Sequence, residues 1–230
     1  MLSYEEFCAN CDALERRVRA AADACGRDAS EIKILPVTKT HPAEVVEYAF
    51  RRGFTAVGEN RVQEALEKMP LFGGKIEWEL IGHLQSNKAA RAVENFNRIE
   101  SVDSEHLLLK LDACARSMGK VQRILLQVNA GNDPAKFGVD AEAAAGLLEA
   151  ALNCANLSVE GLMTIAPLDS DLDVASRCFG NLRKIRDCLS EKFSVPLSEL
   201  SMGMSADLER AIAEGSTLIR VGSFLFGSRQ

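Results

Sequence analysis

The sequence predicts an α/β protein, a single (β/α)8 barrel of the TIM type with an extra N-terminal helix. Two observations support this fold. Eight short β-branched or apolar runs occur along the chain, and amphipathic segments with the three-and-four spacing of one buried helix face lie between them. Strands that alternate with covering helices favour a parallel sheet, and 230 residues are close to the ~250 residues usual for a closed barrel. A doubly wound open sheet is the alternative.

The first element is an amphipathic helix that begins within "MLSYEEFCANCDALERR". Its apolar positions share one helical face and are Phe7, Cys11, Leu14, Val18 and Ala21. Cys8 and Cys11 form a CxxC spacing, which also occurs in redox and zinc sites. A zinc site of this type needs a second pair of ligands, so we interpret both cysteines as helix residues.

The eight predicted strands follow in order. They are "IKILPVT" from residue 32, "TAVGE" from 55, "IEWELIG" from 76, "RIESVD" from 98, "QRILLQVNA" from 122, "SVEGLMTIA" from 158, "LSELSMG" from 197 and "TLIRVGS" from 217. Helical patterns follow Pro42, Asn60, Asp103 and Asp140, and another precedes the seventh run. No Pro-, Gly- or Ser-rich linker divides the chain, so we expect one domain over residues 1–230.

Composition excludes several classes of protein. The net charge of −6 argues against a nucleic-acid binder, which needs clustered Lys and Arg. The N-terminus has acidic residues where a signal peptide needs a basic region, and no apolar run reaches transmembrane length. Seven scattered cysteines fit free thiols in a reducing compartment. We therefore expect a cytoplasmic protein that binds neither nucleic acid nor membrane, and no metal, because no cluster of His and carboxylate residues has metal-ligand spacing.

Polar residues follow the predicted strands, and in such barrels the chemistry lies at the C-terminal ends of the strands. We expect these residues to converge on one mouth: Lys39, Glu59, Asn60, His83, Asn129, Lys136, Ser201, Ser205, Gly222 and Ser223.

The last two loops have features of an anion site. In "SMGMSADLERAI" Ser205 is predicted as the N-cap of a helix, with Asp207 in its first turn. In "RVGSFLFG" Gly222 would allow close approach of the backbone to a ligand, and Ser223 adds a hydroxyl. Barrels frequently bind phosphate after strands seven and eight. The alternative is that Ser205 only caps its helix and Gly222 only makes a turn.

The run "ILPVTKTHP" ends its strand at Lys39, shortly before a proline. This lysine could be a solvated strand end, a salt-bridge partner or a nucleophile at the rim of a pocket. A lysine across a barrel mouth from a phosphate site is the arrangement that pyridoxal phosphate (PLP) needs, with the phosphate bound at one end and the aldehyde condensed with the amine at the other. Burial disfavours the charged form of an amine, and only the neutral amine attacks a carbonyl.

Seven segments together resemble the pyridoxal phosphate homeostasis proteins, single-domain barrels related to the N-terminal half of alanine racemases. They are "PVTKT", "GENRVQEA", "WELIGHLQSNK", "SVDS", "LMTI", "LSMGMSADLERAI" and "RVGSFLFG". The resemblance implies PLP held as a Schiff base on Lys39, without known enzymatic turnover. It also implies cofactor contacts by the residues Asn60, Ser205, Gly222 and Ser223.

The resemblance further implies a role for Arg220 beside the cofactor, at the pyridine nitrogen or at the phosphate. In the racemases a matching arginine faces the nitrogen, resists its protonation and weakens the ring as an electron sink. The segment "NAGNDPAKFGVD" is less typical of the family, so we interpret Lys136 as a solvated loop lysine.

Four other residues have less definite roles. His83 either stacks near the cofactor or forms a hydrogen bond in the barrel mouth. His41 and His106 stand at predicted helix starts and are expected in solvent. Trp78 is expected in the barrel wall or core.

Three functions are compatible with these features. The first is a non-catalytic protein that buffers PLP or delivers it to PLP-dependent apo-enzymes. The second is a PLP-dependent racemase-like enzyme, and the third is a protein-interaction scaffold. Racemisation needs a second base, which in the resembled racemases is a tyrosine from a further domain. The chain ends at Gln230, soon after Ser223, and its tyrosines, Tyr4 and Tyr48, lie in predicted helices. We therefore favour the binding protein and expect a monomer.

Overall fold

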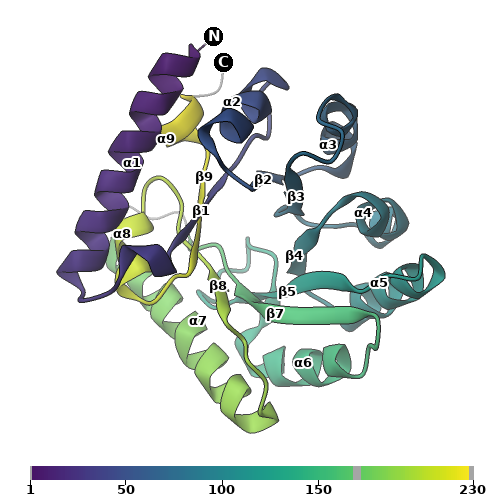
Figure 1. Ribbon diagram of the computed structural model, residues 1–230. Helices are drawn as coiled ribbons and strands as arrows, with labels where there is room; N and C mark the ends of the chain where they lie inside the picture. Colours follow the sequence, from purple (N-terminus) through teal and green to yellow (C-terminus); the bar gives the residue numbers. More distant parts are fainter. Residues whose placement is uncertain (1, 168–171, 228–230) are drawn as a thin grey trace.

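The computed structural model describes residues 2–167 and 172–227, and in it parallel strands form a ring surrounded by helices (Figure 1). The barrel strands are β1 (Lys33–Pro36), β2 (Ala56–Glu59), β3 (Glu77–Leu80), β4 (Arg98–Val102), β5 (Gln122–Asn129), β7 (Leu157–Met163), β8 (Glu199–Ser201) and β9 (Leu218–Val221). Each lies within one of the eight predicted runs, apart from the first residue of β7. The remaining strand, β6 (Val139–Asp140), is short and pairs with β5 outside the ring.

The sheet is closed. Neighbouring strands follow the order β1, β9, β8, β7, β5, β4, β3, β2, and all the pairs are parallel. The two ends of this series, β1 and β2, meet through a bridge between Val37 and Gly58, where the Thr38 N–H donates to the Gly58 carbonyl at 3.0 Å. This closure confirms the (β/α)8 barrel and excludes the doubly wound open sheet.

Helices cover the outside of the ring. They are α1 (Tyr4–Ala24), α2 (Glu44–Arg52), α3 (Val62–Lys68), α4 (Ala89–Asn95), α5 (Glu105–Ser117), α6 (Ala144–Leu152), α7 (Leu172–Phe193), α8 (Leu208–Ala213) and α9 (Ser223–Phe226). Short 3-10 turns add η1 (Ala29–Glu31), η2 (Met69–Leu71), η3 (Ser86–Lys88) and η4 (Ala141–Ala143). Every helical pattern named above forms a helix. The short helices α4 and α9 are additions, since no helical pattern was identified for either.

The predicted N-terminal helix, α1, begins with a reciprocal cap: the Glu6 N–H donates to Ser3 Oγ, and the Ser3 N–H donates to the Glu6 carboxylate. Figure 1 shows α1 beside α8 and α9, and Phe7 stacks on Phe226 of α9 with ring centroids 5.3 Å apart. Its buried face is the predicted one except that Ala22, rather than Ala21, is fully buried. Cys8 and Cys11 are free thiols of this helix, and burial raises the pKa of Cys11 to about 12.

The apolar core lies mainly between the barrel and the helices. Trp78, only 4% exposed, belongs to this layer and packs against Phe72, which confirms its predicted place. A second, small cluster fills part of the barrel interior and consists of Leu35, Val37, Ile81 and Leu218. Alternate residues of each strand thus face the helices or the barrel axis, as the period of two requires.

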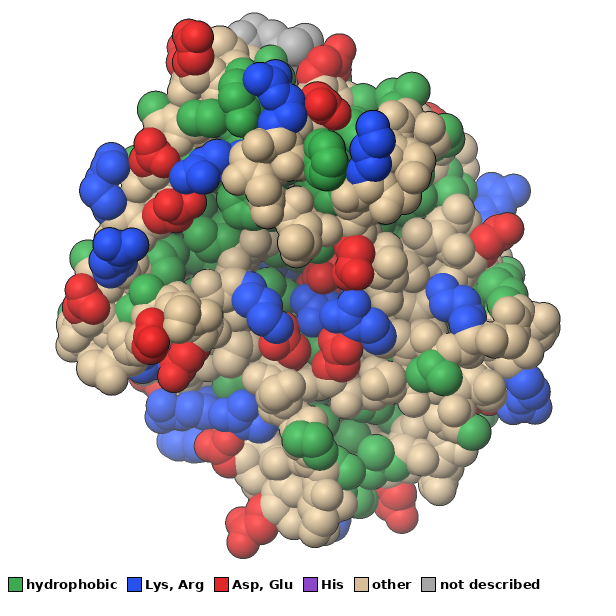
Figure 2. Space-filling view, in the orientation of Figure 1, with side chains coloured by type: hydrophobic (Ala, Val, Ile, Leu, Met, Phe, Trp, Pro, Cys, Tyr) green, Lys and Arg blue, Asp and Glu red, His purple; other side chains and the backbone are tan. Residues whose placement is uncertain are grey.

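Ion pairs fill the other end of the barrel, where the strands begin. Arg98 contacts Glu79 at 2.7 Å, and both Glu160 and Glu199 at 3.1 Å. Burial, followed by the neighbouring Glu100 carboxylate, raises the pKa of Glu79 to about 9. In Figure 2 side chains of both charges gather at the centre of the face seen, inside the ring of helices. We call this cluster, Arg98 with Glu79, Glu160 and Glu199, the ion-pair floor. A ligand site is therefore expected at the opposite end of the barrel.

Within the described ranges, 2–167 and 172–227, the structure contains no helix with the length and hydropathy needed to cross a bilayer.

Candidate functional site

A cavity of about 410 Å³ opens at the C-terminal ends of the strands. Its volume lies within the range usual for small-molecule sites, roughly 300–1,000 Å³. All seven residues predicted to contact the cofactor line it: Lys39, Asn60, His83, Ser205, Arg220, Gly222 and Ser223. The strand-end rule named six of these residues, from the whole length of the chain, and the family resemblance named Arg220.

Lys39 enters this cavity because side chains alternate along the first strand run. Val37 lines the barrel interior, so Lys39, two residues later, faces the same way. Thr38, between them, faces the helices and is fully buried, and its hydroxyl donates to Glu59 at 2.7 Å. Glu59 was expected at the mouth, and this was wrong. It lies on the outer side of β2, where the Lys68 ammonium contacts it at 2.7 Å.

Asn60 and Gly222 are placed by close approaches of backbone. A Cβ on Gly82, two residues after the end of β3, would lie 2.3 Å from the Asn60 carbonyl oxygen, so only glycine lets the two chain segments pass. A Cβ on Gly222 would lie 3.2 Å from the Val37 carbonyl oxygen. Glycine at these two positions lets the ends of neighbouring strands draw together around the cavity.

Two serine hydroxyls face each other at one side of the cavity. Ser223 Oγ lies 3.2 Å from Ser205 Oγ, which also accepts a hydrogen bond from the Phe224 N–H at 3.3 Å. Ser205 was predicted as the N-cap of the next helix, but α8 begins at Leu208 and its N-cap is Asp207. The Asp207 carboxylate accepts the Met204 N–H and so closes the turn between residues 204 and 207, just before α8. Because Ser205 does not cap α8, its hydroxyl is directed towards α9.

Arg220 lies deeper, only 4% exposed. Its guanidinium donates to Ser201 Oγ at 2.7 Å and to the Thr164 carbonyl at 2.8 Å, and it lies 4.0 Å from Glu100. Burial lowers the pKa of Arg220, against the opposing effect of the Glu100 carboxylate. Ser201 was expected at the mouth, but it is fully buried and joins Arg220 to Glu100 beneath the cavity. Hydrogen bonds therefore fix the guanidinium before any ligand arrives.

His83 is part of an aromatic stack at the rim. Its ring lies parallel to that of Phe137, with centroids 4.0 Å apart and planes 10° from each other, and Nδ1 lies 3.3 Å from an Asp103 carboxylate oxygen. Phe137 is 59% exposed although it lines the cavity. The stack places two flat rings at the opening.

Phe137 belongs to the loop in which Asn129 and Lys136 were expected to reach the mouth, and neither lines the cavity. The Asn129 side chain donates to the Asp133 carbonyl at 3.0 Å and accepts the Asp133 N–H at 3.1 Å, so it holds the loop. Lys136 is half-buried rather than fully solvated. The Gln127 side chain donates to the Phe137 carbonyl at 2.9 Å and sets the position of this aromatic residue.

Sequence reasoning missed several lining residues. Gln127 had a detectable signal, because it is a polar residue in an apolar strand, two positions after inward-facing Leu125. Phe137 and Met204 had none, since both lie in loops without periodicity. The other missed residues are Val37, Ile81, Gly82, Ile165 and Ala206.

The other aromatic and imidazole side chains lie away from the cavity. His41 was expected in solvent, but it is half-buried against Phe226, with ring centroids 5.4 Å apart. His106 is exposed on α5, as predicted. Tyr4 and Tyr48 pack against each other between α1 and α2, with centroids 5.5 Å apart. In the part of the chain that the structure describes, no group of three or more His, Cys, Asp or Glu is placed to hold a metal ion.

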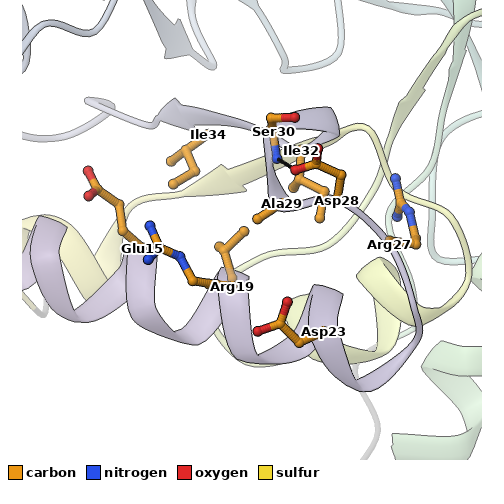
Figure 3. A pocket seen from close by; sticks show the side chains of 10 residues that line it. Glu15, Arg19, Asp23, Arg27, Asp28, Ala29, Ser30, Ile32 and Ile34 are labelled. Carbon is orange, nitrogen blue, oxygen red and sulfur yellow. Dashed lines mark hydrogen bonds between the residues drawn. The ribbon is translucent and has the colours of Figure 1, made fainter.

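A larger cavity, of about 680 Å³, lies between α1 and the segment that leads into β1 (Figure 3). Several of its polar groups are already engaged in the fold. Arg27 donates to the Ile212 carbonyl at 2.8 Å and to the Ser216 carbonyl at 2.9 Å, and Asp28 accepts the Ser30 N–H, marked by the dashed line. No strand ends there with its C-terminus among the residues shown, so we place the chemistry in the smaller cavity.

The smaller cavity combines four kinds of group. It has a primary amine, a pair of hydroxyls beside backbone N–H groups, a buried guanidinium, and flat apolar surface. An amine reacts with a carbonyl, hydroxyls and N–H groups bind an oxyanion, and flat surface suits a planar ring. The site thus fits a planar aldehyde that carries an anionic group.

Comparison with known proteins agrees with this chemistry. Residues 9–230 match the family described as alanine racemase, N-terminal domain. The pyridoxal phosphate homeostasis protein of Aquifex aeolicus is 38% identical over 224 residues, which cover 96% of this chain and 98% of that protein. The protein of the same name from Synechocystis is 40% identical over 200 residues, 86% of this chain and 92% of that protein.

A solved structure supports the same family relationship. PipY of Synechococcus elongatus, determined with PLP bound, has a TM-score of 0.81 and 38% identity, and the match covers 86% of this chain and 93% of that one. On the sequence and on the fold, the chain belongs to the family of the pyridoxal phosphate homeostasis proteins, and it carries the alanine racemase N-terminal domain.

Proposed function

We propose that the protein binds pyridoxal phosphate as a Schiff base on Lys39, and buffers the cofactor or delivers it without turning over a substrate. One observation carries the proposal: Lys39 and the Ser205–Ser223 pair line a single cavity of about 410 Å³. PLP supplies an aldehyde that condenses with a primary amine. The names of the relatives and the PLP bound in PipY support the choice of this ligand.

The cavity residues divide the ligand between them. Ser205 and Ser223 would hold the phosphate, because hydroxyls bind anions and because these two already face each other at 3.2 Å. Asn60, which follows β2, and Gly222, which follows β9, would contact the cofactor from opposite sides of β1. The His83–Phe137 stack would cover the opening and exclude water from the bound ring.

We assign Arg220 to the ring rather than to the phosphate. The serines lie at the rim, whereas Arg220 is almost fully buried and is held by Ser201 and Thr164. A guanidinium keeps its own protons and cannot pass one to a ring nitrogen, so this contact would leave the nitrogen unprotonated. That arrangement favours storage of the cofactor over carbanion chemistry.

A racemase-like activity is the second candidate. It is favoured by the family's alanine racemase domain, but it needs a second proton donor or acceptor across the substrate. Tyr4 and Tyr48 pack together at α1 and α2, away from the cavity. We therefore infer that the protein is non-catalytic. We also propose that it is a single-domain monomer over residues 1–230, acts in the cytoplasm, and has PLP-dependent apo-enzymes as recipients of the cofactor.

The proposal is tested by adding PLP to the purified protein and recording its visible absorption, followed by borohydride reduction and peptide mapping. We expect a coloured protein whose reduced adduct maps to Lys39. Lys39→Ala should abolish the adduct without unfolding the protein, because this side chain is only half-buried. Lys136→Ala is the matched control and should leave the adduct unchanged. A protein that stays colourless, or an adduct on Lys136, would overturn the proposal.

A further inference from the structure

Thr40, directly after Lys39, has an unusual backbone conformation. Its φ angle is 64°, in the left-handed region that β-branched residues rarely adopt. Such strain persists only where the surrounding structure holds it, and it concentrates beside functional groups. Contacts must therefore stabilise the chain around Lys39.

A buried cluster on α3 and β2 supplies these contacts. The Lys68 ammonium donates to the Thr38 carbonyl at 2.9 Å, which fixes the chain before Lys39. The Glu64 carboxylate accepts the Thr40 N–H, which fixes the chain after it, and contacts the Lys68 ammonium at 2.9 Å. Lys68 thus joins the two flanks of Lys39 through a single cation.

The third acceptor of Lys68 anchors the cluster to the sheet. Its ammonium contacts Glu59 at 2.7 Å, and the same Glu59 oxygen accepts the Thr38 hydroxyl at 2.7 Å. Lys68 is 7% exposed and Glu59 is fully buried. With three acceptors for its three N–H groups, the ammonium has one orientation.

None of these charged groups lines the cavity, so none touches a ligand there. A buried charge cluster also carries a desolvation penalty, and apolar side chains would serve stability alone at least as well. What this cluster adds is geometry: hydrogen bonds to backbone groups on both sides of one residue.

We propose that Lys68, held by Glu59 and Glu64, is a positioning residue that fixes the backbone of Thr38 and Thr40 so that the Lys39 amine faces the cavity. This inference rests on the proposed function, because it concerns the lysine that forms the adduct. In adduct formation the amine and the aldehyde form a C=N bond and release one water. Lys68 takes no part in that exchange and acts only on the approach of the amine.

The test measures two quantities separately in Lys68→Met: the equilibrium constant for the covalent adduct, and the non-covalent affinity for PLP in a Lys39→Ala background. We expect the adduct constant to fall about tenfold, the scale of strain released at one residue. The non-covalent affinity should stay unchanged, whereas a collapsed cavity would lower both.

Thr40→Gly provides the rescue. Glycine adopts a positive φ without strain, so Lys68→Met with Thr40→Gly should recover most of the adduct. Glu64→Ala changes a partly exposed side chain and removes the acceptor of the Thr40 N–H. If Lys68→Met does not fold, Glu64→Ala should show the same loss of adduct, and Glu64→Ala with Thr40→Gly should show the same recovery.

Lys120→Met is the matched control, because Lys120 also donates to a backbone carbonyl, that of Val93, but far from Lys39. It should leave the adduct unchanged. A wild-type protein without adduct would refute the proposed function itself. Adduct formation in both Lys68→Met and Glu64→Ala that equals wild type, or a loss that Thr40→Gly does not restore, would refute the positioning role while leaving the proposed function standing.

Discussion

Ser205 and Ser223 are held differently from the other polar residues of the cavity. Arg220 is fixed by Ser201 and Thr164, but the two serine hydroxyls have each other and one backbone N–H as partners. An arriving phosphate can therefore replace a weak contact between neutral groups by stronger, charge-assisted ones.

This difference predicts a ligand-specific effect. Ser205→Ala with Ser223→Ala should weaken PLP binding at least about tenfold, because a hydrogen bond to a charged group contributes ~1.5–3 kcal/mol. Unphosphorylated pyridoxal should bind almost as before. Titration calorimetry with both ligands checks this result, and equal losses for the two would move the phosphate elsewhere in the cavity.

Individual side chains were predictable from sequence where strand periodicity places them. Lys39 and Arg220 continue inward-facing positions of their strands and line the cavity, although Lys39 was predicted from its place at a strand end and Arg220 from the family resemblance. Glu59 was misplaced because a strand-end carboxylate was read as a mouth residue, although it shares the outward face with Val57. Phe137 was missed because its position depends on a contact with Gln127 across a loop.

At the level of elements, the strands were the most predictable part of the fold, because buried parallel strands are continuous apolar runs. Helix boundaries that depend on local hydrogen bonds were less predictable. Ser205 and Asp207 are both favourable N-caps, and only the turn that Asp207 closes with Met204 decides between them. The two-residue strand β6 has no periodicity that a sequence pattern could reveal.

The buried contact of Glu79 on β3 with Arg98 on β4 predicts a pH dependence. The pKa of Glu79 is raised to about 9 by burial and by Glu100. Between its usual value of 4.5 and 9, the unfolded chain releases this proton while the folded protein keeps it. The unfolding free energy should therefore fall as the pH rises through this window.

Glu79→Gln should remove this dependence, because the amide stays neutral and its oxygen still accepts from Arg98. Relative to wild type, the variant should gain about 1 kcal/mol or more between pH 5 and pH 9, measured by urea unfolding. Glu77→Gln, at a half-exposed neighbour on the same strand, is the control and should show a much smaller change. An identical pH profile for wild type and Glu79→Gln would mean that Glu79 is ionised in the folded protein.

At the scale of the whole molecule, the barrel separates stability from chemistry. The ion-pair floor and the outer apolar layer hold the strands, while the opposite end carries the amine, the hydroxyls and the aromatic stack. A barrel arranged in this way can support binding or catalysis, depending on which further groups face the bound ligand.

The groups that line this cavity predict binding without turnover. With PLP bound, the protein should not racemise or decarboxylate amino acids at an enzyme-like rate. General acid–base groups each contribute ~10²- to 10⁴-fold, and no tyrosine lines the described cavity. Incubation with L-alanine in deuterated water, followed by measurement of α-deuterium and chirality, checks this result. Lys39-dependent exchange with formation of the enantiomer at ~1 s⁻¹ or faster, the low end for enzymes, would instead support a racemase.

The closure of the barrel at β1 and β2 has a consequence for motion. These two strands meet through one isolated bridge, between Val37 and Gly58, so parting them breaks fewer backbone hydrogen bonds than parting a full strand pair. A ligand that contacts Lys39 on one edge and Asn60 on the other would join the edges from inside the barrel. We therefore expect PLP to slow amide hydrogen exchange at Thr38 more than at the centre of β5. Binding of the cofactor would then also stabilise the closed form of the barrel.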